Sequence, residues 1–257
     1  MLSLLFALLD RWLVPVPDAA RVGWLKGVTY AHRGLHGAGV PENSPAAFAL
    51  AAGQGLGIEC DVQRSSDGQA MVFHDWDLDR LTAEHGAVLD RSAAQLGAIA
   101  LAGGADTIPT LRQVLDLVAG RVPLLIEIKS RRGVHVAPLC LAVRRVLEGY
   151  LGPVAVMSFD PRVPAWFRRY SPRTVHGLVV TEEGRRTLFA RAKRHLALWQ
   201  GKPQFLAYDV RDLPSPFARS LHRRGFPLLT WTVRSPELAE RAEAHADAPI
   251  AEGAGVA

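Results

Sequence analysis

The chain lacks the features that mark several large classes of protein. Its 257 residues include only two cysteines, Cys60 and Cys140. These are too few for a disulfide framework, so we expect buried thiols and a reducing, cytoplasmic setting. The formal charge of +5 is small, and no basic motif interleaved with aromatic residues occurs, which argues against a nucleic-acid partner. No repeat, linker or low-complexity tract divides the sequence, which favours one main domain.

Three carboxylates lie in two segments that read as strands. Side chains alternate along a strand, so Glu59 and Asp61 share one face. Glu127 and Lys129 repeat this spacing at the carboxyl end of another apolar run. Three neighbouring carboxylates repel one another unless a cation lies between them. The pattern predicts one hard divalent ion, Mg²⁺ or Ca²⁺; the structural alternative is a set of salt bridges with Arg33 and Lys129.

A short turn is expected to bring His74 back toward Asp61. The connection 65–68 is too short for a parallel crossover, and its Asp-Gly pair is a strong hairpin signal. His74 and Asp61 lie about equally far from the centre of this turn. His32 ends another strand-like segment and could supply the other side of the site. Two imidazoles that flank a cation suit proton transfer to and from a phosphoryl group.

Short motifs follow one another along the chain in a specific order and spacing. They are His32-Arg33-Gly34, Pro41-Glu42-Asn43-Ser44, Glu59-Cys60-Asp61-Val62, Asp67-Gly68, His74-Asp75, Ile108-Pro109-Thr110-Leu111, Glu127-Ile128-Lys129, Ser158-Phe159 and Trp231-Thr232-Val233. Over about residues 28–252 this order resembles the glycerophosphodiester phosphodiesterase family. The resemblance implies a (β/α)8 barrel of the TIM type, one divalent ion, and hydrolysis of glycerophosphodiesters to an alcohol and glycerol 3-phosphate.

The resemblance assigns the chemistry to residues that the strand pattern had already selected. It implies that His32 and His74 are the acid/base pair and that Glu59, Asp61 and Glu127 are the metal ligands. In family terms, a hydroxyl next to the phosphoester attacks phosphorus first, and water then opens the cyclic phosphate. The protein is therefore expected to be a phosphoric diester hydrolase with a small-molecule substrate.

The remaining roles concern the substrate. Arg33 is implied as a phosphate contact, a role suited to its forked donors, and Lys129 as a point charge beside the reacting phosphorus. Glu42 would orient His32 or approach the metal. Trp231 would shape the wall that receives the alcohol portion.

Two positions depart from the family pattern. Arg234 stands where Asn usually follows Trp-Thr-Val, and Ala251-Glu252 replaces the usual Thr-Asp pair. Both changes lie on the leaving-group side of the expected barrel, so they bear on the identity of the substrate more than on catalysis.

Length and composition agree with a single barrel domain over residues 27–257. Barrels of about 250 residues are single domains, and 49% apolar residues provide a large core. The hairpin strand 69–74 is expected to extend the second strand, before a small insertion at about 77–108 and a helix over 110–119. The expected barrel strands are 27–32, 57–62, 123–129, 154–158, 174–180, 205–209, 227–233 and 248–252.

The amino-terminal segment 1–26 is expected to begin with an amphipathic helix. Asp10 and Arg11 interrupt its apolar run far below the roughly 20 residues of a membrane span, and no basic residue precedes the run as in a secretory signal. We favour packing of this helix on the barrel, with peripheral membrane contact through residues 1–14 as the alternative. The apolar face would contain Leu4, Leu5, Leu8, Leu9 and Trp12.

Two other functions remain open beside hydrolysis of soluble glycerophosphodiesters. One is release of the headgroup from lysophospholipids in the manner of a phospholipase D, which the apolar amino terminus would suit. The other is a barrel that binds phosphoesters without turnover. The presence of both His32 and His74 argues against the last, because binding alone does not require two titratable groups.

Overall fold

The computed structural model describes residues 2–131, 133–182 and 187–256. Met1 and Ala257, the outer ends of the two predicted segments, lie outside this range. The chain divides into two compact units. The first unit is Thr29–Val154, and the second unit combines Met1–Val28 with Ala155–Ala257.

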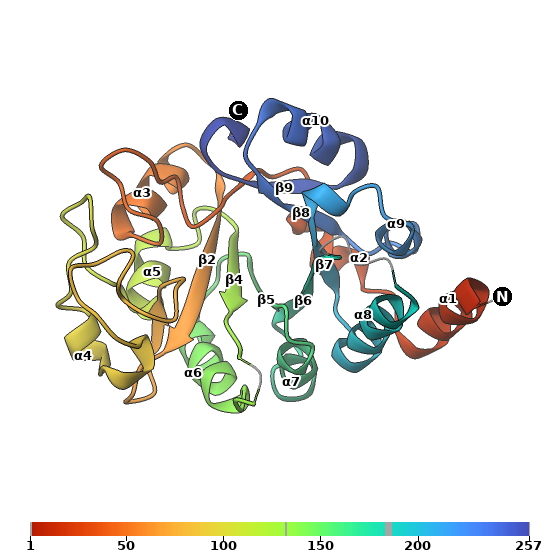
Figure 1. Cartoon of the computed structure of the whole chain (residues 1–257), viewed down its shortest axis with the longest axis horizontal. Helices are drawn as coiled ribbons and strands as arrows, with labels where there is room; N and C mark the ends of the chain where they lie inside the picture. Colours follow the sequence, from red (N-terminus) through yellow and green to blue (C-terminus); the bar gives the residue numbers. More distant parts are fainter. Residues whose placement is uncertain (1, 132, 183–186, 257) are drawn as a thin grey trace. The chain divides into compact units, whose positions relative to one another are not determined.

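The first unit is built on the long strand β2. This strand pairs in parallel with β1 and β4 and antiparallel with β3 (Figure 1). The predicted hairpin is therefore present, and Phe73 N–H donates to the carbonyl of Asp61 at 3.0 Å. β2 is buried on both faces over most of its length, as expected for a strand with parallel neighbours. The strands are β1 Tyr30–Ala31, β2 Gly57–Arg64, β3 Ala70–Val72 and β4 Leu124–Ile128.

Helices of the first unit begin at local capping signals. Ser44 accepts from Ala47 N–H at 3.1 Å at the start of α3, with Pro45 in the first turn. Thr110 and Gln113 form a capping box at the start of α5, inside the predicted helix 110–119. The helical elements are α3 Pro45–Gly53, η2 Val88–Asp90, α4 Ala93–Leu96, α5 Leu111–Val118 and α6 Ala137–Leu147.

The segment 77–108 has a small core of its own. It carries η2 and α4, together with isolated bridges between Asp77 and Ala87 and between Ala100 and Thr107. Its apolar side chains pack under β3, which explains how a stretch rich in Gly and Ala stays ordered. The buried members of this cluster are Met71, Phe73, Leu78, Val88, Leu96, Ile99, Leu101 and Ile108.

The second unit contains five strands that pair in parallel in chain order. They are β5 Val154–Ser158, β6 Val175–Val180, β7 Phe205–Asp209, β8 Leu228–Val233 and β9 Ala248–Ala251. Helical elements separate the strands, and Ser-Pro pairs begin both α9 and α10. The helical elements are α1 Leu2–Leu13, α2 Ala19–Val22, η1 Gly23–Leu25, α7 Arg162–Tyr170, α8 Leu188–Gly201, η3 Val210–Asp212, α9 Pro216–His222, α10 Pro236–His245 and η4 Gly253–Gly255.

The amino-terminal helix α1 packs against α8 within the second unit (Figure 1). Phe6 stacks on the ring of His195 with centroids 4.4 Å apart, and Asp10 accepts from His195 and from Trp199. We expected the apolar face of this helix to pack on the barrel. Instead, Phe6 and Asp10, which are not part of that predicted face, contact α8.

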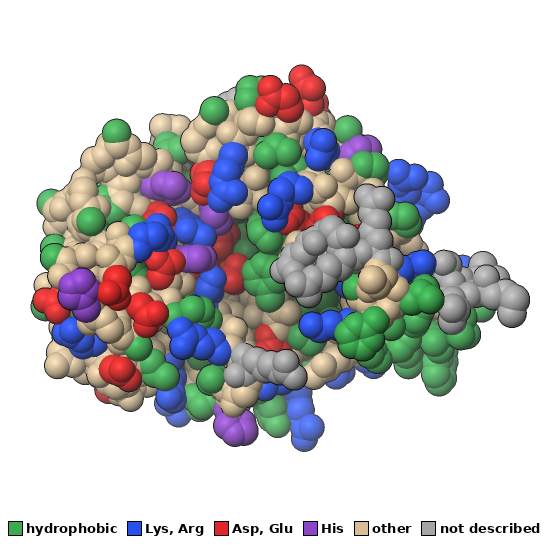
Figure 2. Space-filling model, in the orientation of Figure 1, with side chains coloured by type: hydrophobic (Ala, Val, Ile, Leu, Met, Phe, Trp, Pro, Cys, Tyr) green, Lys and Arg blue, Asp and Glu red, His purple; other side chains and the backbone are tan. Residues whose placement is uncertain are grey.

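Part of the predicted apolar face of α1 is exposed instead. Leu5, Leu8 and Trp12 are 52%, 58% and 83% exposed, and Figure 2 shows hydrophobic side chains gathered where α1 and α8 lie. Among the helices of the described residues, none is long and apolar enough to cross a membrane.

Candidate metal and phosphoester site

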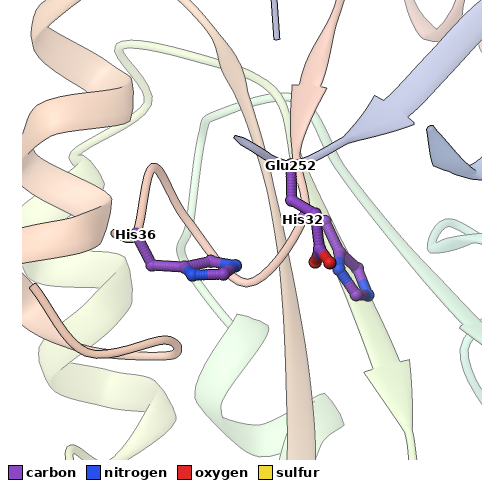
Figure 3. A group of neighbouring side chains, drawn as sticks. All are labelled: His32, His36 and Glu252. Atoms are coloured by element: carbon purple, nitrogen blue, oxygen red, sulfur yellow. The ribbon is translucent and has the colours of Figure 1, made fainter. Parts of the chain in front are cut away.

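The loop after β1 carries the first histidine of the site. His32 is 9% exposed, and its Nε2 lies 4.0 Å from Glu59 Oε2. Arg33 adopts a left-handed backbone with φ of 55°, which is uncommon for a residue with a long side chain. Its N–H donates to the same Glu59 oxygen at 3.1 Å, which holds this conformation. Figure 3 shows His32 and His36 on this loop.

Gly34 closes the loop tightly. Its φ is 79°, and a Cβ atom at this position would meet Ala47 Cβ at 2.8 Å. Both the positive φ and the close approach to α3 require glycine here. The His32-Arg33-Gly34 motif therefore has a structural reason for its third residue.

Three carboxylates from β2 and β4 meet beside this loop. Oxygens of Glu59, Asp61 and Glu127 all lie within 4.8 Å of one another, and Asp61 pairs with Glu127 in the parallel register. Lys129 Nζ lies 3.4 Å from Asp61 Oδ1 and 3.3 Å from Glu127 Oε1. The predicted residues after β1, on β2 and at the end of β4 are thus brought together, and charged side chains gather over β2 and β4 in Figure 2. They are His32, Arg33, Glu59, Asp61, Glu127 and Lys129.

The electrostatics of the three carboxyls differ. Burial, with Asp61 and Glu127 close by, holds the pKa of Glu59 well above its usual range. Burial also raises the pKa of Glu127. Burial alone would raise the pKa of Asp61 too, but Lys129 and other cationic neighbours lower it overall. Nearby cations thus offset the effect of burial on the pKa of Asp61 but not on the pKa of Glu59 or Glu127.

The predicted alternative of internal salt bridges is met only in part. Arg33 Nε lies 3.3 Å from Asp61 Oδ2, and Lys129 contacts Asp61 and Glu127. These two cations face three carboxylates, and the pKa of Glu59 and that of Glu127 stay raised beside them. Buried carboxylate oxygens in this arrangement are the donors that hard divalent ions prefer. The chain therefore has a candidate acidic site for a divalent metal.

Asn43 fixes the orientation of Asp61. Its Nδ2 donates to Asp61 Oδ2 at 3.0 Å, and its Oδ1 accepts from Asp61 N–H at 3.2 Å. Asn43 also has φ of 55° and donates its N–H to Arg33 O at 2.9 Å. This buried amide links the loop after β1 to the cluster and was not singled out from the sequence, although it lies in the Pro41-Glu42-Asn43-Ser44 motif.

His74 enters the site from the loop after β3. Its Nδ1 lies 2.6 Å from Asp75 Oδ1, so Nε2 is the nitrogen that can exchange a proton with a ligand. Burial lowers the pKa of His74, although Asp61 raises it. The pKa of Asp75 falls to about 2 in spite of burial, because Arg80 and His74 hydrogen-bond to it.

A chain of ion pairs ties this histidine to Arg33. Arg80 contacts Asp75 and also donates to Glu42 at 2.8 Å and 3.0 Å. Glu42 in turn accepts from Arg33 NH1 at 2.8 Å. Glu42 is thus placed between two arginines, and its predicted contact with His32 or the metal stays a prediction.

Gln63 supports the backbone that carries His74. It follows Glu59 and Asp61 on the same face of β2, and its Nε2 donates to the carbonyls of Phe73, His74 and Asp75. The strand alternation that selected the two carboxylates points equally to Gln63, but only the folded hairpin shows what it holds.

Trp231 lies in the second unit, on β8. Its Nε1 donates to Ala207 O at 3.0 Å, and its ring meets that of Phe159 edge-on, with centroids 5.3 Å apart. The two residues that depart from the family pattern also contact each other, because Arg234 Nε donates to Glu252 Oε1. The two departures from the family pattern therefore form an ion pair with each other in the second unit.

Residues 32–253 match the model of the glycerophosphoryl diester phosphodiesterase family. This chain belongs to that family. A protein of Mycobacterium tuberculosis named "probable glycerophosphodiester phosphodiesterase 2" is 30% identical over 82% of this chain and 81% of its own. A glycerophosphodiester phosphodiesterase of Bacillus altitudinis is 38% identical, but that match spans only 42% of this chain and 47% of the relative. The predicted family and enzyme class, a phosphoric diester hydrolase, are confirmed.

A solved structure supports the fold. A phosphodiesterase of Oleispira antarctica, determined in complex with the product sn-glycerol-3-phosphate, has a TM-score of 0.77 to this chain. The match is 23% identical and covers 88% of this chain and 93% of that one. The predicted TIM-type (β/α)8 barrel is confirmed, with β3 as an additional antiparallel strand on β2.

Proposed function

We propose that this chain hydrolyses glycerophosphodiesters to an alcohol and glycerol 3-phosphate. The observation that carries the proposal is the buried cluster of Glu59, Asp61 and Glu127, within 4.8 Å of one another and bordered by two histidines. Membership of the family and the glycerol 3-phosphate bound to the Oleispira antarctica relative support the same substrate class.

In this proposal His32 and His74 transfer protons on opposite sides of the reacting phosphate. The hydrogen bond that His74 Nδ1 donates to Asp75 Oδ1 fixes the ring and leaves Nε2 for the substrate. The first histidine removes the proton of the attacking hydroxyl, and the second protonates the departing alkoxide. A glycerol hydroxyl would act as the first nucleophile, and water would then open the cyclic phosphate with the two proton transfers reversed.

Arg33 and Lys129 are proposed to hold the phosphate oxygens. Both are already paired with cluster carboxylates, Arg33 with Asp61 and Lys129 with Asp61 and Glu127. They therefore keep fixed positions before a ligand arrives, which lowers the cost of reorganisation during reaction. Glu42 positions Arg33, and Trp231 is proposed to contact the alcohol portion.

Glu59, Asp61 and Glu127 are proposed to hold one divalent cation, Mg²⁺ or Ca²⁺. Such an ion would neutralise charge that develops on the phosphoryl oxygens. The raised pKa of Glu59 supports this assignment, because a buried carboxyl that is short of positive charge gains most from a bound cation.

The test is release of glycerol 3-phosphate from glycerophosphocholine by the purified protein. We expect release with Mg²⁺ or Ca²⁺, loss with EDTA, and recovery when either ion is restored. Release that persists in EDTA would contradict the metal assignment. Absence of release with both ions, together with absence of release from glycerophosphoethanolamine and glycerophosphoglycerol, would contradict the proposed reaction.

A second candidate is headgroup release from lysophospholipids at the same site. The exposed Leu5, Leu8 and Trp12 on α1 favour it, because apolar side chains on an amphipathic helix insert readily into a lipid surface. We propose peripheral membrane contact through residues 1–14 on this ground. Cys60 and Cys140 are buried and are not joined in a disulfide, which supports the proposed cytoplasmic setting.

A further inference from the structure

The first unit contains a cavity beside the candidate metal site. Its volume is about 540 Å³, within the roughly 300–1,000 Å³ typical of small-molecule sites. Gln63 and Lys129 line it. Lys129 is the side chain that contacts Asp61 and Glu127 of the cluster. A ligand whose phosphate lies at the cluster could therefore extend directly into this cavity.

Two segments contribute apolar side chains to the lining of the cavity. Leu89 belongs to the insertion, and Val134 belongs to the connection between β4 and α6. They are 46% and 49% exposed. Exposed apolar side chains that line one cavity gain free energy when an apolar group displaces the water beside them. The chemistry of this lining suits a hydrocarbon chain.

The charged side chains around the cavity are mostly basic. Among its described lining residues, Arg64, Lys129 and Arg131 are cationic and Asp90 is anionic. The guanidinium of Arg131 lies 4.2 Å from the centroid of the Trp76 ring, a cation–π contact between two lining residues of the cavity. This balance disfavours the cationic part of a choline or ethanolamine headgroup and suits a chain attached to an anionic phosphate.

We propose that this cavity binds the single hydrocarbon chain of a lysophospholipid while its phosphodiester occupies the cluster. The inference rests on the proposed function, because it uses the same phosphate position. It favours the second candidate substrate class, single-chain lipids, and assigns the hydrocarbon chain to the cavity lined by the insertion and the β4–α6 connection.

Binding can be tested without turnover, using n-alkyl phosphates from ethyl to octyl and calorimetry with Ca²⁺ present. These monoesters offer the phosphate and the chain but no diester bond. We expect affinity to rise by up to about fourfold per buried methylene until the cavity is full. An affinity that does not depend on chain length in the wild-type protein would overturn the inference.

Variants locate the effect. Leu89→Asp and Val134→Asp each place a charge in the cavity lining and are expected to flatten the dependence on chain length. Leu151→Asp is the matched control, because Leu151 is 98% exposed and does not line the cavity. The hydrocarbon chain would lie elsewhere if the dependence of affinity on chain length weakened equally in Leu151→Asp. It would also lie elsewhere if this dependence stayed unchanged in both cavity variants while each retained its thermal transition.

Turnover separates this inference from the proposed function. The substrates are glycerophosphocholine and its butanoyl, hexanoyl and octanoyl lyso derivatives, all kept below their micelle concentrations. We expect kcat/KM to rise with chain length and this rise to disappear in Leu89→Asp, whereas glycerophosphocholine hydrolysis changes less than about twofold. Hydrolysis of glycerophosphocholine without any gain from the chain contradicts the cavity inference alone. Chain-dependent binding of alkyl phosphates without hydrolysis of any diester contradicts the proposed reaction alone.

Discussion

Two histidine–aspartate pairs, one in each unit, share the same local geometry. In the first unit, His74 Nδ1 lies 2.6 Å from Asp75. In the second unit, His195 Nδ1 lies 2.9 Å from Asp10. Both imidazoles therefore use one nitrogen to hold a carboxylate. The two pairs differ in what surrounds them, and this difference indicates which of them can do chemistry.

The second-unit pair is enclosed by apolar and aromatic groups. Phe6 stacks on His195 with an interplanar angle of 4°, and Trp199 Nε1 donates to Asp10 at 2.7 Å. Asp10 is 3% exposed and His195 is 9% exposed. The contacts of Phe6 and Asp10 fix α1 on α8, and Phe217 of α9 meets the His195 ring edge-on, so we assign this pair a structural role.

The first-unit pair lies among charges and is partly open to solvent. The His74 side chain is 29% exposed, and Asp61, Lys129 and Arg33 act on its pKa in opposite directions. A titratable ring that is held at one nitrogen and reachable at the other, beside a carboxylate cluster, can exchange protons with a ligand. A histidine–aspartate pair therefore indicates a catalytic role only when charged side chains such as Asp61 and Lys129 surround it and solvent reaches the second ring nitrogen.

Removal of the first-unit imidazole is expected to have the largest effect. His74→Ala should lower kcat by about 10²–10⁴-fold, the usual contribution of a general acid or base, with the thermal transition nearly unchanged. Hydrolysis of glycerophosphocholine measures the loss. His85→Ala is the control, because His85 also holds an aspartate, Asp79, at 2.8 Å but lies exposed on the insertion. Near-wild-type turnover in His74→Ala would remove the acid/base assignment.

The first-unit pair lies beside the carboxylate cluster, whereas the second-unit pair is surrounded by apolar and aromatic groups. Glu59→Gln tests the role of this cluster. The pKa of Glu59 is raised by burial and by its two carboxylate neighbours, so the metal-free protein holds a proton there to a higher pH than an ordinary glutamate. A divalent ion requires the ionised form, so binding should release protons, and apparent affinity should fall as the pH falls through this raised pKa.

Glu59→Gln has no such proton to release. The substitution should lower the affinity for the metal by at least about 10–100-fold, because mutation of residues that only hydrogen-bond to metal ligands already causes a loss of this size. Calorimetry in buffers of different ionisation enthalpy measures affinity and proton release together. An unchanged metal titration would exclude Glu59 as a ligand.

Removal of the aspartate of the second-unit pair should change stability and leave the chemistry intact. Asp10→Ala leaves the buried donors of His195 and Trp199 without their acceptor, at a cost of about 1–3 kcal/mol in the free energy of unfolding. Denaturant unfolding measures this loss, and kcat/KM for glycerophosphocholine should stay within about twofold of wild type. A large loss of turnover at full stability would show that the pair is more than structural.

The barrel was predictable from the sequence because its strands are continuous apolar runs with clear ends. β5 and β7 have the predicted bounds, and β9, which rested on Pro249-Ile250-Ala251, is present. β1 is shorter than predicted, since Gly27 adopts φ of 70° and its N–H donates to Asp247 outside the strand ladder. Periodicity locates strands well, but it does not show where a turn conformation ends them.

The partners of the site residues were less predictable. The carboxylates follow from alternation on β2 and β4, but Arg80 lies 38 residues from Glu42 and 5 from Asp75, and no local pattern joins the three. The cavity lining comes from the insertion and the β4–α6 connection, which tertiary packing brings together. The face of α1 that packs was assigned differently from the sequence, because Phe6 and the polar Asp10 contact α8 while Leu5, Leu8 and Trp12 are exposed.

The smallest expected effect distinguishes the charge of Asp75 from its geometry. Burial lowers the pKa of His74, and the hydrogen bond to Asp75 partly opposes that shift. Asp75→Asn keeps an oxygen that can accept from Nδ1 but removes the negative charge, so the pKa of His74 should fall further.

If Nε2 accepts a proton in the first step, the rate rises as the pH climbs through this pKa. The acid limb of the kcat/KM profile should therefore move to lower pH, while the plateau falls by roughly tenfold because the imidazolium loses its counter-charge. Asp79→Asn, which alters the exposed pair with His85, should leave the profile unchanged; an acid limb that moves to higher pH in Asp75→Asn would show that Asp75 does not act through His74.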